Sequence, residues 1–166
     1  MRNLLPAPVI ILAVILQSAV ISRVTLLSGF ADLPLVMLAA WALQEEVDSA
    51  WHWAVATGML VGFVSGILWV APVASYLLVV AMAQILQRRV WQAPLLAMFT
   101  VTFLGTLASS LFSLTALRLA GVPLLIGDVF GFVTLPGILL NMLLAIPVFV
   151  VMRDLARWIH PAPEVE

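Results

Sequence analysis

The side chains in this sequence with most scope for chemistry are hydroxyls in the apolar stretch from residue 92 to residue 118. They include Thr100, Thr102, Thr106, Ser109, Ser110 and Ser113. Such hydroxyls can line a polar cavity for a small molecule, or each can bond the carbonyl four residues back in its own helix. No histidine or acid lies in this stretch, so a serine nucleophile there would lack a general base.

Known catalytic and metal-binding motifs do not occur elsewhere in the sequence. It contains neither a G-x-S-x-G elbow nor an H-E-x-x-H pair. His52 and His160 stand alone, and the lack of cysteine removes thiolate chemistry and cysteine metal sites. We therefore expect no catalytic residues, no metal site, no cofactor and no enzymatic activity.

The composition is that of a chain dissolved in a bilayer. Apolar residues make up 64% of the 166 positions and charged residues 9%, and the mean hydropathy is +1.22. A soluble domain is nearer half apolar and a quarter charged. The net charge of -1 offers no basic face to a nucleic acid. No linker or charge block divides the chain, which predicts one transmembrane domain over 1–166.

The uncharged stretches predict an all-α protein with about six transmembrane helices. A bilayer core about 30 Å thick needs about 20 apolar helical residues. No charged side chain lies between His52 and Arg88, where one helix would be about 52 Å long. This stretch must therefore fold back, and Pro72 marks the expected turn. The expected spans are about 6–22, 32–44, 52–70, 72–88, 92–118 and 128–153.

The second of these spans is short for a full crossing. We expect Asp32 to cap its N-terminus, with Pro34 in the first turn, where a missing N–H costs nothing. A tilted crossing and a re-entrant segment both fit its length. Asp128 is expected to cap the sixth helix in the same way.

Arginine placement orients the expected bundle, because short cytoplasmic loops are enriched in positive charge. Whether or not the second segment crosses, the orientation with more arginines on the cytoplasmic side places the turn after the fourth span and the C-terminal tail in the cytoplasm. The expected cytoplasmic anchors are Arg88, Arg89, Arg153 and Arg157. Tryptophans near the predicted span ends are expected to anchor the bundle at the headgroups. They are Trp41, Trp51, Trp53, Trp91 and Trp158.

Small residues recur at a spacing of four along the third expected span. They are Ala54, Gly58, Gly62 and Gly66. This spacing places them on one stripe, which lets another helix backbone come close. The stripe can pack against a helix of the same chain or bind the helix of a second protein.

The sixth expected span carries an amide and two prolines. Asn141 lies near its middle, where an amide needs a hydrogen-bond partner, and we expect it to join two helices. Pro136 and Pro147 should each free carbonyls that neighbouring helices must satisfy. We therefore expect this helix inside the bundle.

The same span also resembles the last membrane helix of the MreD family of rod shape-determining proteins. The resemblance is carried by Leu135-Pro136-Gly137, the N-x-L-L-A run that starts at Asn141, Pro147 with the aromatic Phe149, and the arginine-bearing tail from Arg153 to Trp158. Upstream, Leu16-Gln17-Ser18 and Asp32-Leu33-Pro34 resemble the family's L-Q-S and its aspartate at the start of helix two.

The resemblance implies a non-catalytic scaffold or regulator of the bacterial cell-elongation complex, which builds peptidoglycan and sets cell shape. It implies binding to MreC and, through the complex, to RodA, its penicillin-binding transpeptidase and MreB. The implied location is the bacterial inner membrane. The implied fold resembles the six-helix substrate-binding subunit of energy-coupling-factor transporters.

A second interpretation is a small-molecule-binding subunit of a membrane transporter. It requires polar groups that converge between helices. The candidates are Gln17, Gln84, Asn141 and the hydroxyls between residues 100 and 113.

Overall fold

The structure, a computed structural model, describes residues 6–19, 25–44, 50–66, 68–89, 93–123 and 125–159. The expected all-α class is confirmed, because the described chain is helical apart from one short hairpin. The elements are α1 (Pro6–Ala19), β1 (Thr25–Leu26), β2 (Gly29–Phe30), α2 (Leu33–Ala42), α3 (Ala50–Ser65), α4 (Val70–Arg89), α5 (Pro94–Leu119), α6 (Ile126–Asp128), the π-helical segment η3 (Val129–Thr134) and α7 (Leu135–Ile159).

Three helical stretches within the described residues are long and apolar enough to cross a membrane. They are Val70–Arg88, Pro94–Leu119 and Ile126–Trp158, the last of which joins α6, η3 and α7. Leu33–Ala42 and Ala50–Ser65 are apolar but shorter. Length and composition therefore support three of the expected spans directly.

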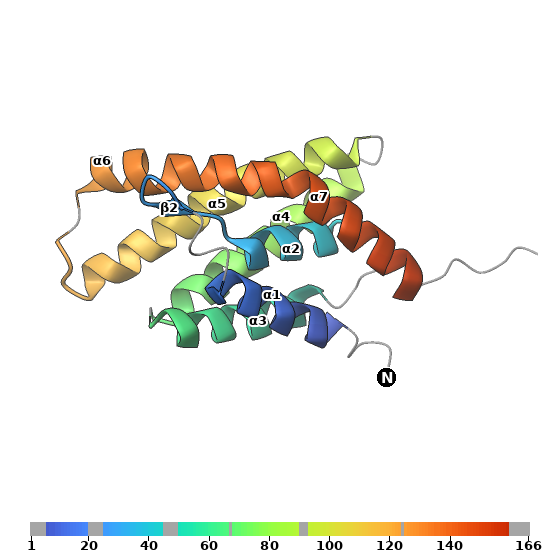
Figure 1. Ribbon diagram of the computed structural model, residues 1–166, viewed down its shortest axis with the longest axis horizontal. Coiled ribbons are helices and arrows are strands. Elements are labelled where there is room, and N and C mark those ends of the chain that lie inside the picture. Colours follow the sequence, from blue (N-terminus) through green and yellow to red (C-terminus); the bar gives the residue numbers. More distant parts are fainter. Residues whose placement is uncertain are drawn as a thin grey trace, which may run out of the picture.

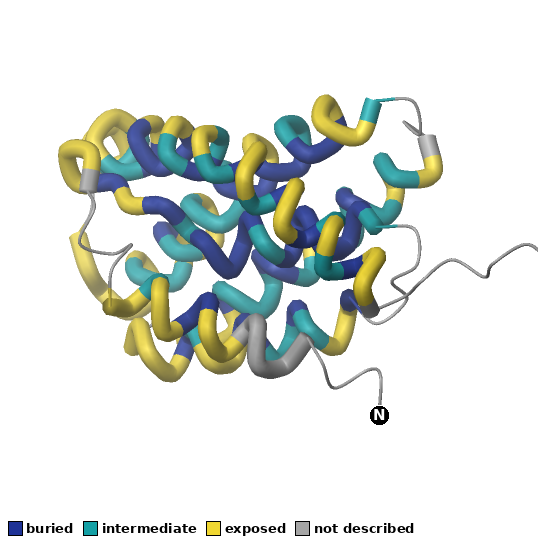
Figure 2. Tube along the Cα trace, turned by 45° about the vertical axis from the view of Figure 1, so that its right-hand side comes forward, coloured by how far each residue is buried: buried dark blue, intermediate teal, exposed yellow. Residues whose placement is uncertain are grey.

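The helices run alternately along one long axis, with α2 enclosed among the others (Figure 1). Helix α2 packs against α7, α4, α1 and α5, and its Leu35 and Val36 have no exposed surface. Figure 2 shows the buried segments gathered along the centre of the bundle. Because neighbours surround α2, every face of it is apolar, and it needs no polar side.

Helix α3 packs closely on α4 through glycine. A Cβ on Gly58 would lie 2.6 Å from the Cα of Val73, and a Cβ on Gly62 would lie 2.7 Å from the Cα of Trp69. Ala54, earlier on the same stripe, is fully buried. This part of the stripe therefore lies against a helix of the same chain.

Gly66 does not belong to that stripe, so the prediction that it lies on the third helix is wrong. Helix α3 ends at Ser65, and Gly66 has φ +65, a left-handed conformation that glycine adopts without strain at a helix C-terminus. The expected turn at Pro72 is also displaced. Helix α4 begins at Val70, so Pro72 lies in its first turn, where its lack of an N–H is tolerated.

The β1–β2 hairpin satisfies a carbonyl that Pro136 leaves free. Proline lacks the N–H that would bond the carbonyl four residues back, which belongs to Phe132. The backbone N–H of Ser28 donates to that carbonyl at 3.1 Å. The expectation of a freed carbonyl is therefore correct, but a hairpin satisfies it rather than a helix. Here the backbone of the long helix widens into η3, which ends at Thr134.

The expected capping role of Asp128 is wrong, whereas that of Asp32 is confirmed. The long helix begins at Ile126, two residues before Asp128, whose side chain makes no capping hydrogen bond. Asp32 is the N-cap of α2, and Pro34 lies in the first turn. Asp128 cannot act as an N-cap as Asp32 does, because the backbone before Asp128 is already helical.

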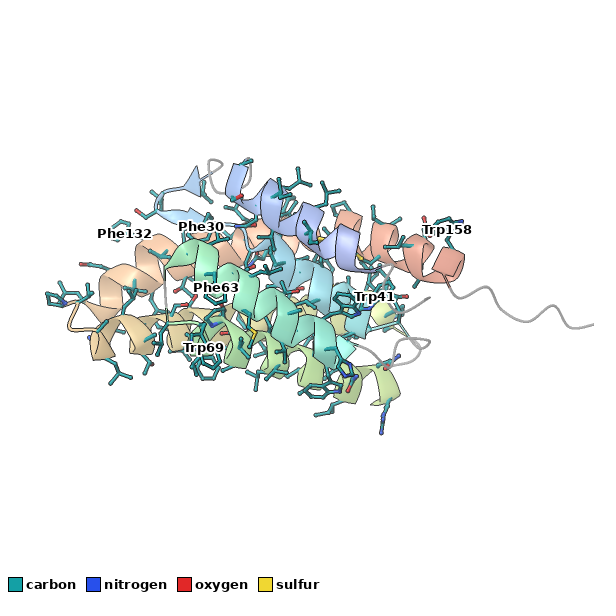
Figure 3. All side chains as sticks on the ribbon, turned by 90° about the horizontal axis from the view of Figure 1, so that it is seen from below. Phe30, Trp41, Phe63, Trp69, Phe132 and Trp158 are labelled. Carbon is teal, nitrogen blue, oxygen red and sulfur yellow. The ribbon has the colours of Figure 1, made fainter. Side chains whose placement is uncertain are left out.

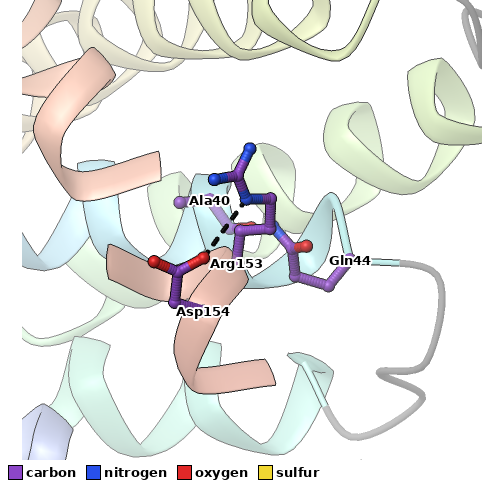
Figure 4. A network of polar contacts seen from close by, with 4 residues as sticks. All are labelled: Ala40, Gln44, Arg153 and Asp154. Carbon is purple, nitrogen blue, oxygen red and sulfur yellow. Dashed lines mark hydrogen bonds and ion pairs between the residues drawn. The ribbon is translucent and has the colours of Figure 1, made fainter. Parts of the chain in front are cut away.

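The expected arginine anchors lie at one end of the bundle. Arg88 and Arg89 end α4, and Arg153 and Arg157 lie in the last turns of α7, at the end where the N-terminal helix begins (Figure 1). Figure 4 shows this end, where Arg153 Nε pairs with the adjacent Asp154 at 3.4 Å. Gln44 donates to the carbonyl of Ala40 at 2.8 Å beside it. An exposed pair of this kind contributes little stability.

The tryptophans divide between the surface and the core. Trp158 projects from the end of α7 and is 76% exposed, as expected of an anchor (Figure 3). Trp41 is only 5% exposed and belongs to the hydrophobic core. Trp41 therefore packs against other helices of the chain and presents little of its ring to the surroundings. Trp91 lies outside the described residues.

Candidate functional site

Asp32 is the central residue of the polar contacts in the bundle. Its Oδ1 accepts a hydrogen bond from the backbone N–H of Leu35 at 3.1 Å, as an N-cap does. The positive end of the α2 dipole points at this carboxyl group, which stabilises its negative charge. The carboxyl group is therefore held by the helix that it caps.

Asn141 joins three segments of the chain. Its Oδ1 accepts the backbone N–H of Asp32 at 2.7 Å, and its Nδ2 donates to Oγ1 of Thr106 at 2.9 Å. Thr106 in turn donates to the carbonyl of Thr102 at 2.7 Å. Asn141 is 1% exposed. Its amide connects the start of α2, the middle of α5 and the middle of the long last helix, Ile126–Trp158.

Gln17 holds the same stretch of backbone from the other side. Its Nε2 donates to the carbonyl of Ala31 at 2.6 Å, and its Oε1 accepts the backbone N–H of Leu33 at 2.9 Å. Ala31 and Asp32 precede α2 and Leu33 is its first residue, so the carbonyl of Ala31 and the N–H of Leu33 have no regular helical partners. The two amides, from α1 and α7, supply those partners.

Tyr76 is a member of this group that sequence reasoning missed. Its hydroxyl donates to Asp32, at 3.0 Å from Oδ1 and 3.3 Å from Oδ2, and the side chain is 1% exposed. A signal was present in the sequence, because Tyr76 is the chain's one tyrosine and lies within a long uncharged stretch. A buried phenol needs a hydrogen-bond partner.

We call Gln17, Asp32, Tyr76, Thr106 and Asn141 the polar cluster. Thr106 lies near the middle of Pro94–Leu119, and Asn141 near the middle of Ile126–Trp158. The expectation that Asp32 lies at the end of a span is therefore wrong. The extended segment before α2 carries the chain along α7, so that α2 starts halfway along the bundle. An acid at such depth is costly to bury and needs partners.

The polar cluster forms one wall of a cavity of about 430 Å³. The cavity is lined by parts of six helices and the hairpin. These are α1, β2, the start of α2, the end of α3, the start of α4, the second half of α5 and the start of the long last helix. The remaining polar side chains that line it are Ser65, Ser109, Ser110 and Ser113. Pockets for small ligands typically enclose about 300–1,000 Å³ and are mostly apolar with a few placed polar groups.

The hydroxyls of α5 fall into three groups. The first is Thr102, whose buried Oγ1 has no hydrogen-bond partner among the described residues. Thr100 and Thr106 donate to the carbonyls four residues back, at 2.8 Å and 2.7 Å. Ser109, Ser110 and Ser113 make no hydrogen bond to any residue that the structure describes. These serines share the helix face of Thr106 and line the cavity, so their hydroxyls are available to a bound molecule.

The structure brings together only part of what the sequence singled out. Gly137 and Asn141 line the cavity, whereas Leu135 is 56% exposed on the outer face of the helix and Pro147 is also exposed. The α3 glycines lie behind the cavity wall against α4, and the arginine anchors lie at the far end. Gln84 lies on α4 but is not among the lining residues.

We expect Tyr76→Phe to destabilise the chain. The substitution removes one of two donors to the Asp32 carboxyl group, and a hydrogen bond to a charged group contributes about 1.5–3 kcal/mol. The thermal unfolding midpoint of the purified chain in nanodiscs should fall. Thr115→Val is the matched control, because that exposed hydroxyl bonds only the carbonyl of Leu111 in its own helix. Equal midpoints for the two variants would contradict a stabilising role for the Tyr76 hydroxyl.

The geometry offers a bound molecule one carboxyl group and several hydroxyls within an apolar wall. Among the described residues, no three potential metal-ligating side chains lie close enough together to hold an ion. Comparison with protein-family models, curated proteins and solved structures gave no match to this chain. The site must therefore be interpreted from its own chemistry and from the motif residues that meet there.

Proposed function

We propose that the chain is a non-catalytic membrane scaffold or regulator of the bacterial cell-elongation complex, of the MreD type. One observation carries the proposal. The three sequence segments that resemble this family, far apart along the chain, meet in the polar cluster.

The three segments meet through specific hydrogen bonds. Gln17 of Leu16-Gln17-Ser18 bonds the backbone on both sides of Asp32, and Asn141 of the last helix bonds the backbone N–H of Asp32 itself. Resemblance by chance would not be expected to select residues that contact one another. Their convergence supports the view that the three motifs form one set of interacting residues, which holds the short second helix in the bundle.

In this proposal the chain crosses the bacterial inner membrane six times. The second crossing consists of the hairpin and extended segment followed by α2, which accounts for a helix of only 10 residues. Such a six-helix arrangement would resemble the substrate-binding subunit of energy-coupling-factor transporters. The end that carries Arg88, Arg89, Arg153 and Arg157 would face the cytoplasm, with the C-terminus, because positive charge is enriched there.

The proposed partner is MreC, with RodA, its penicillin-binding transpeptidase and MreB reached through the complex. The short connections between helices leave little surface outside the bilayer for an active site. The outer faces of the helices carry large exposed apolar side chains, such as Phe63 and Leu143, which are 79% and 73% exposed. Such faces suit contact with lipid or with the single membrane helix of a partner.

The experiment that tests this proposal is co-purification. The tagged chain is expressed beside the MreC of its own organism, extracted in mild detergent and passed through a sizing column. We expect the two proteins to elute together at a fixed ratio. A tagged membrane protein of similar size from outside the complex is the control. Separate elution of the chain and MreC would contradict the scaffold function.

The cavity favours a second candidate function, a small-molecule-binding subunit of a membrane transporter. Gln17 and Asn141, both expected to contribute, do line it, together with the serines of α5. Under this function the chain would carry a bound molecule and would not associate with MreC.

A further inference from the structure

The cavity beside the polar cluster has features of a site that recognises a ligand, beyond any role as a packing defect. Its wall is mostly apolar, and its polar groups come from several helices, with the largest number on α5. With a volume of about 430 Å³, the cavity is large enough to hold a small ligand.

The two amide side chains of the polar cluster already make hydrogen bonds within the chain. Gln17 and Asn141 each use both the oxygen and the nitrogen of the side chain in hydrogen bonds to other residues of the chain. They hold the wall in place and have little left for a ligand. Recognition must therefore come from the other polar groups of the cavity.

One carboxyl oxygen of Asp32 can accept a further hydrogen bond. Its Oδ1 accepts from both Leu35 and Tyr76, whereas among the described residues Oδ2 has only the longer contact of 3.3 Å with the same Tyr76 hydroxyl. The residue is half-buried and lines the cavity. A hydrogen-bond donor placed in the cavity can reach a carboxyl oxygen, and a negatively charged group there would be repelled.

The serines supply the remaining contacts. Ser109, Ser110 and Ser113 lie on one face of α5, line the cavity and have no hydrogen-bond partner among the described residues. Each hydroxyl can donate and accept. A molecule with a donor at Asp32 and a second polar group near these serines would satisfy both sets of groups at once.

We propose that this cavity binds a small, largely apolar molecule that carries amine or hydroxyl donors and no negative charge. The donor contacts the Asp32 carboxyl group, further polar groups contact the serines of α5, and the body fills the apolar part. The site belongs to the chain itself, so this proposal stands or falls independently of MreC binding. It also names the ligand class that the transporter-subunit function would require.

Three probes of one shape test the charge preference. The purified chain in nanodiscs is titrated with 2-phenylethylamine, 2-phenylethanol and 3-phenylpropanoate, and its thermal unfolding midpoint is followed. We expect the amine and the alcohol to raise the midpoint with saturation, and the carboxylate to have no effect. Native mass spectrometry of the untreated protein should also detect a bound molecule without negative charge.

Two substitutions separate binding in the cavity from partition into the bilayer. Ser110→Leu replaces a cavity hydroxyl with a larger apolar side chain that occupies part of the cavity. It should weaken binding of the amine by about tenfold or more, which corresponds to about 1.4 kcal/mol. Thr115→Leu places the same side chain on the same helix, at an exposed residue outside the lining, and should leave binding unchanged.

The proposal is overturned if no probe stabilises the chain and no molecule is bound after purification. It is also overturned if the carboxylate binds as well as the amine, or if the probes stabilise both variants equally with the unsubstituted chain. These results leave the co-elution of the chain with MreC untouched, so failure of one proposal can be told from failure of the other.

Discussion

Gly58→Leu is expected to abolish the close packing of α3 on α4. Already the first side-chain atom would lie 2.6 Å from the Cα and 2.9 Å from the backbone nitrogen of Val73, and backbone atoms cannot turn aside as a flexible side chain can. Overpacking of this kind costs about 3 kcal/mol or more where the backbone must move. The folded yield in detergent and the thermal unfolding midpoint should both fall sharply.

Gly131→Leu is the matched control for this experiment. A Cβ at Gly131 meets no atom within 4 Å, and the residue is exposed on the π-helical segment. We expect this variant to fold with a yield close to that of the unsubstituted chain. If instead Gly58→Leu folds normally but no longer co-elutes with MreC, the stripe serves a partner helix and not α4.

Asn141→Leu is expected to have the second largest effect. Leucine fills a similar volume but removes the acceptor for the backbone N–H of Asp32 and the donor to Thr106. An N–H left without a partner in a buried place costs about 1–3 kcal/mol. The thermal unfolding midpoint of the purified chain in nanodiscs should fall.

Leu143→Ala provides the comparison on the same helix. Leu143 is 73% exposed on the outer face and makes no part of the polar cluster, so its truncation should leave the midpoint nearly unchanged. A loss of stability as large as that of Asn141→Leu would show that the amide has no special role in joining the helices.

The long helices could be predicted from the sequence because a bilayer-length run of uncharged residues has few alternatives. The predicted span 92–118 becomes Pro94–Leu119, and 128–153 lies within Ile126–Ile159. The cap at Asp32 was predictable for a local reason, since an aspartate and a proline before an apolar run form a helix start. These features depend on residues close together in the chain.

The site could not be predicted to the same extent, because it depends on contacts between distant residues. Asp32 and Asn141 are 109 positions apart, and nothing in their spacing indicates that they meet. The hairpin has strands of only two residues, too short for an alternating pattern, yet it carries α2 to the middle of the bundle. Without it, Asp32 is naturally assigned to the end of a span.

The role of the α5 serines could not be decided from the sequence. The sequence presented the hydroxyls of α5 as either cavity groups or groups satisfied within their own helix. All four of Thr106, Ser109, Ser110 and Ser113 line the cavity. The Thr106 hydroxyl bonds the preceding turn, whereas the three serine hydroxyls have no partner among the described residues. Only the position of neighbouring helices distinguishes these two cases.

The scaffold function is tested most directly by photo-crosslinking in intact membranes beside tagged MreC. A photoreactive residue is placed, one at a time, at exposed apolar positions on four helices: Ile15, Phe63, Leu104 and Leu143. Val79, which is fully buried, serves as the negative control. We expect crosslinks to MreC from the positions of one face and none from Val79. Absence of any MreC crosslink from all four exposed positions, with the chain folded and expressed, would contradict it.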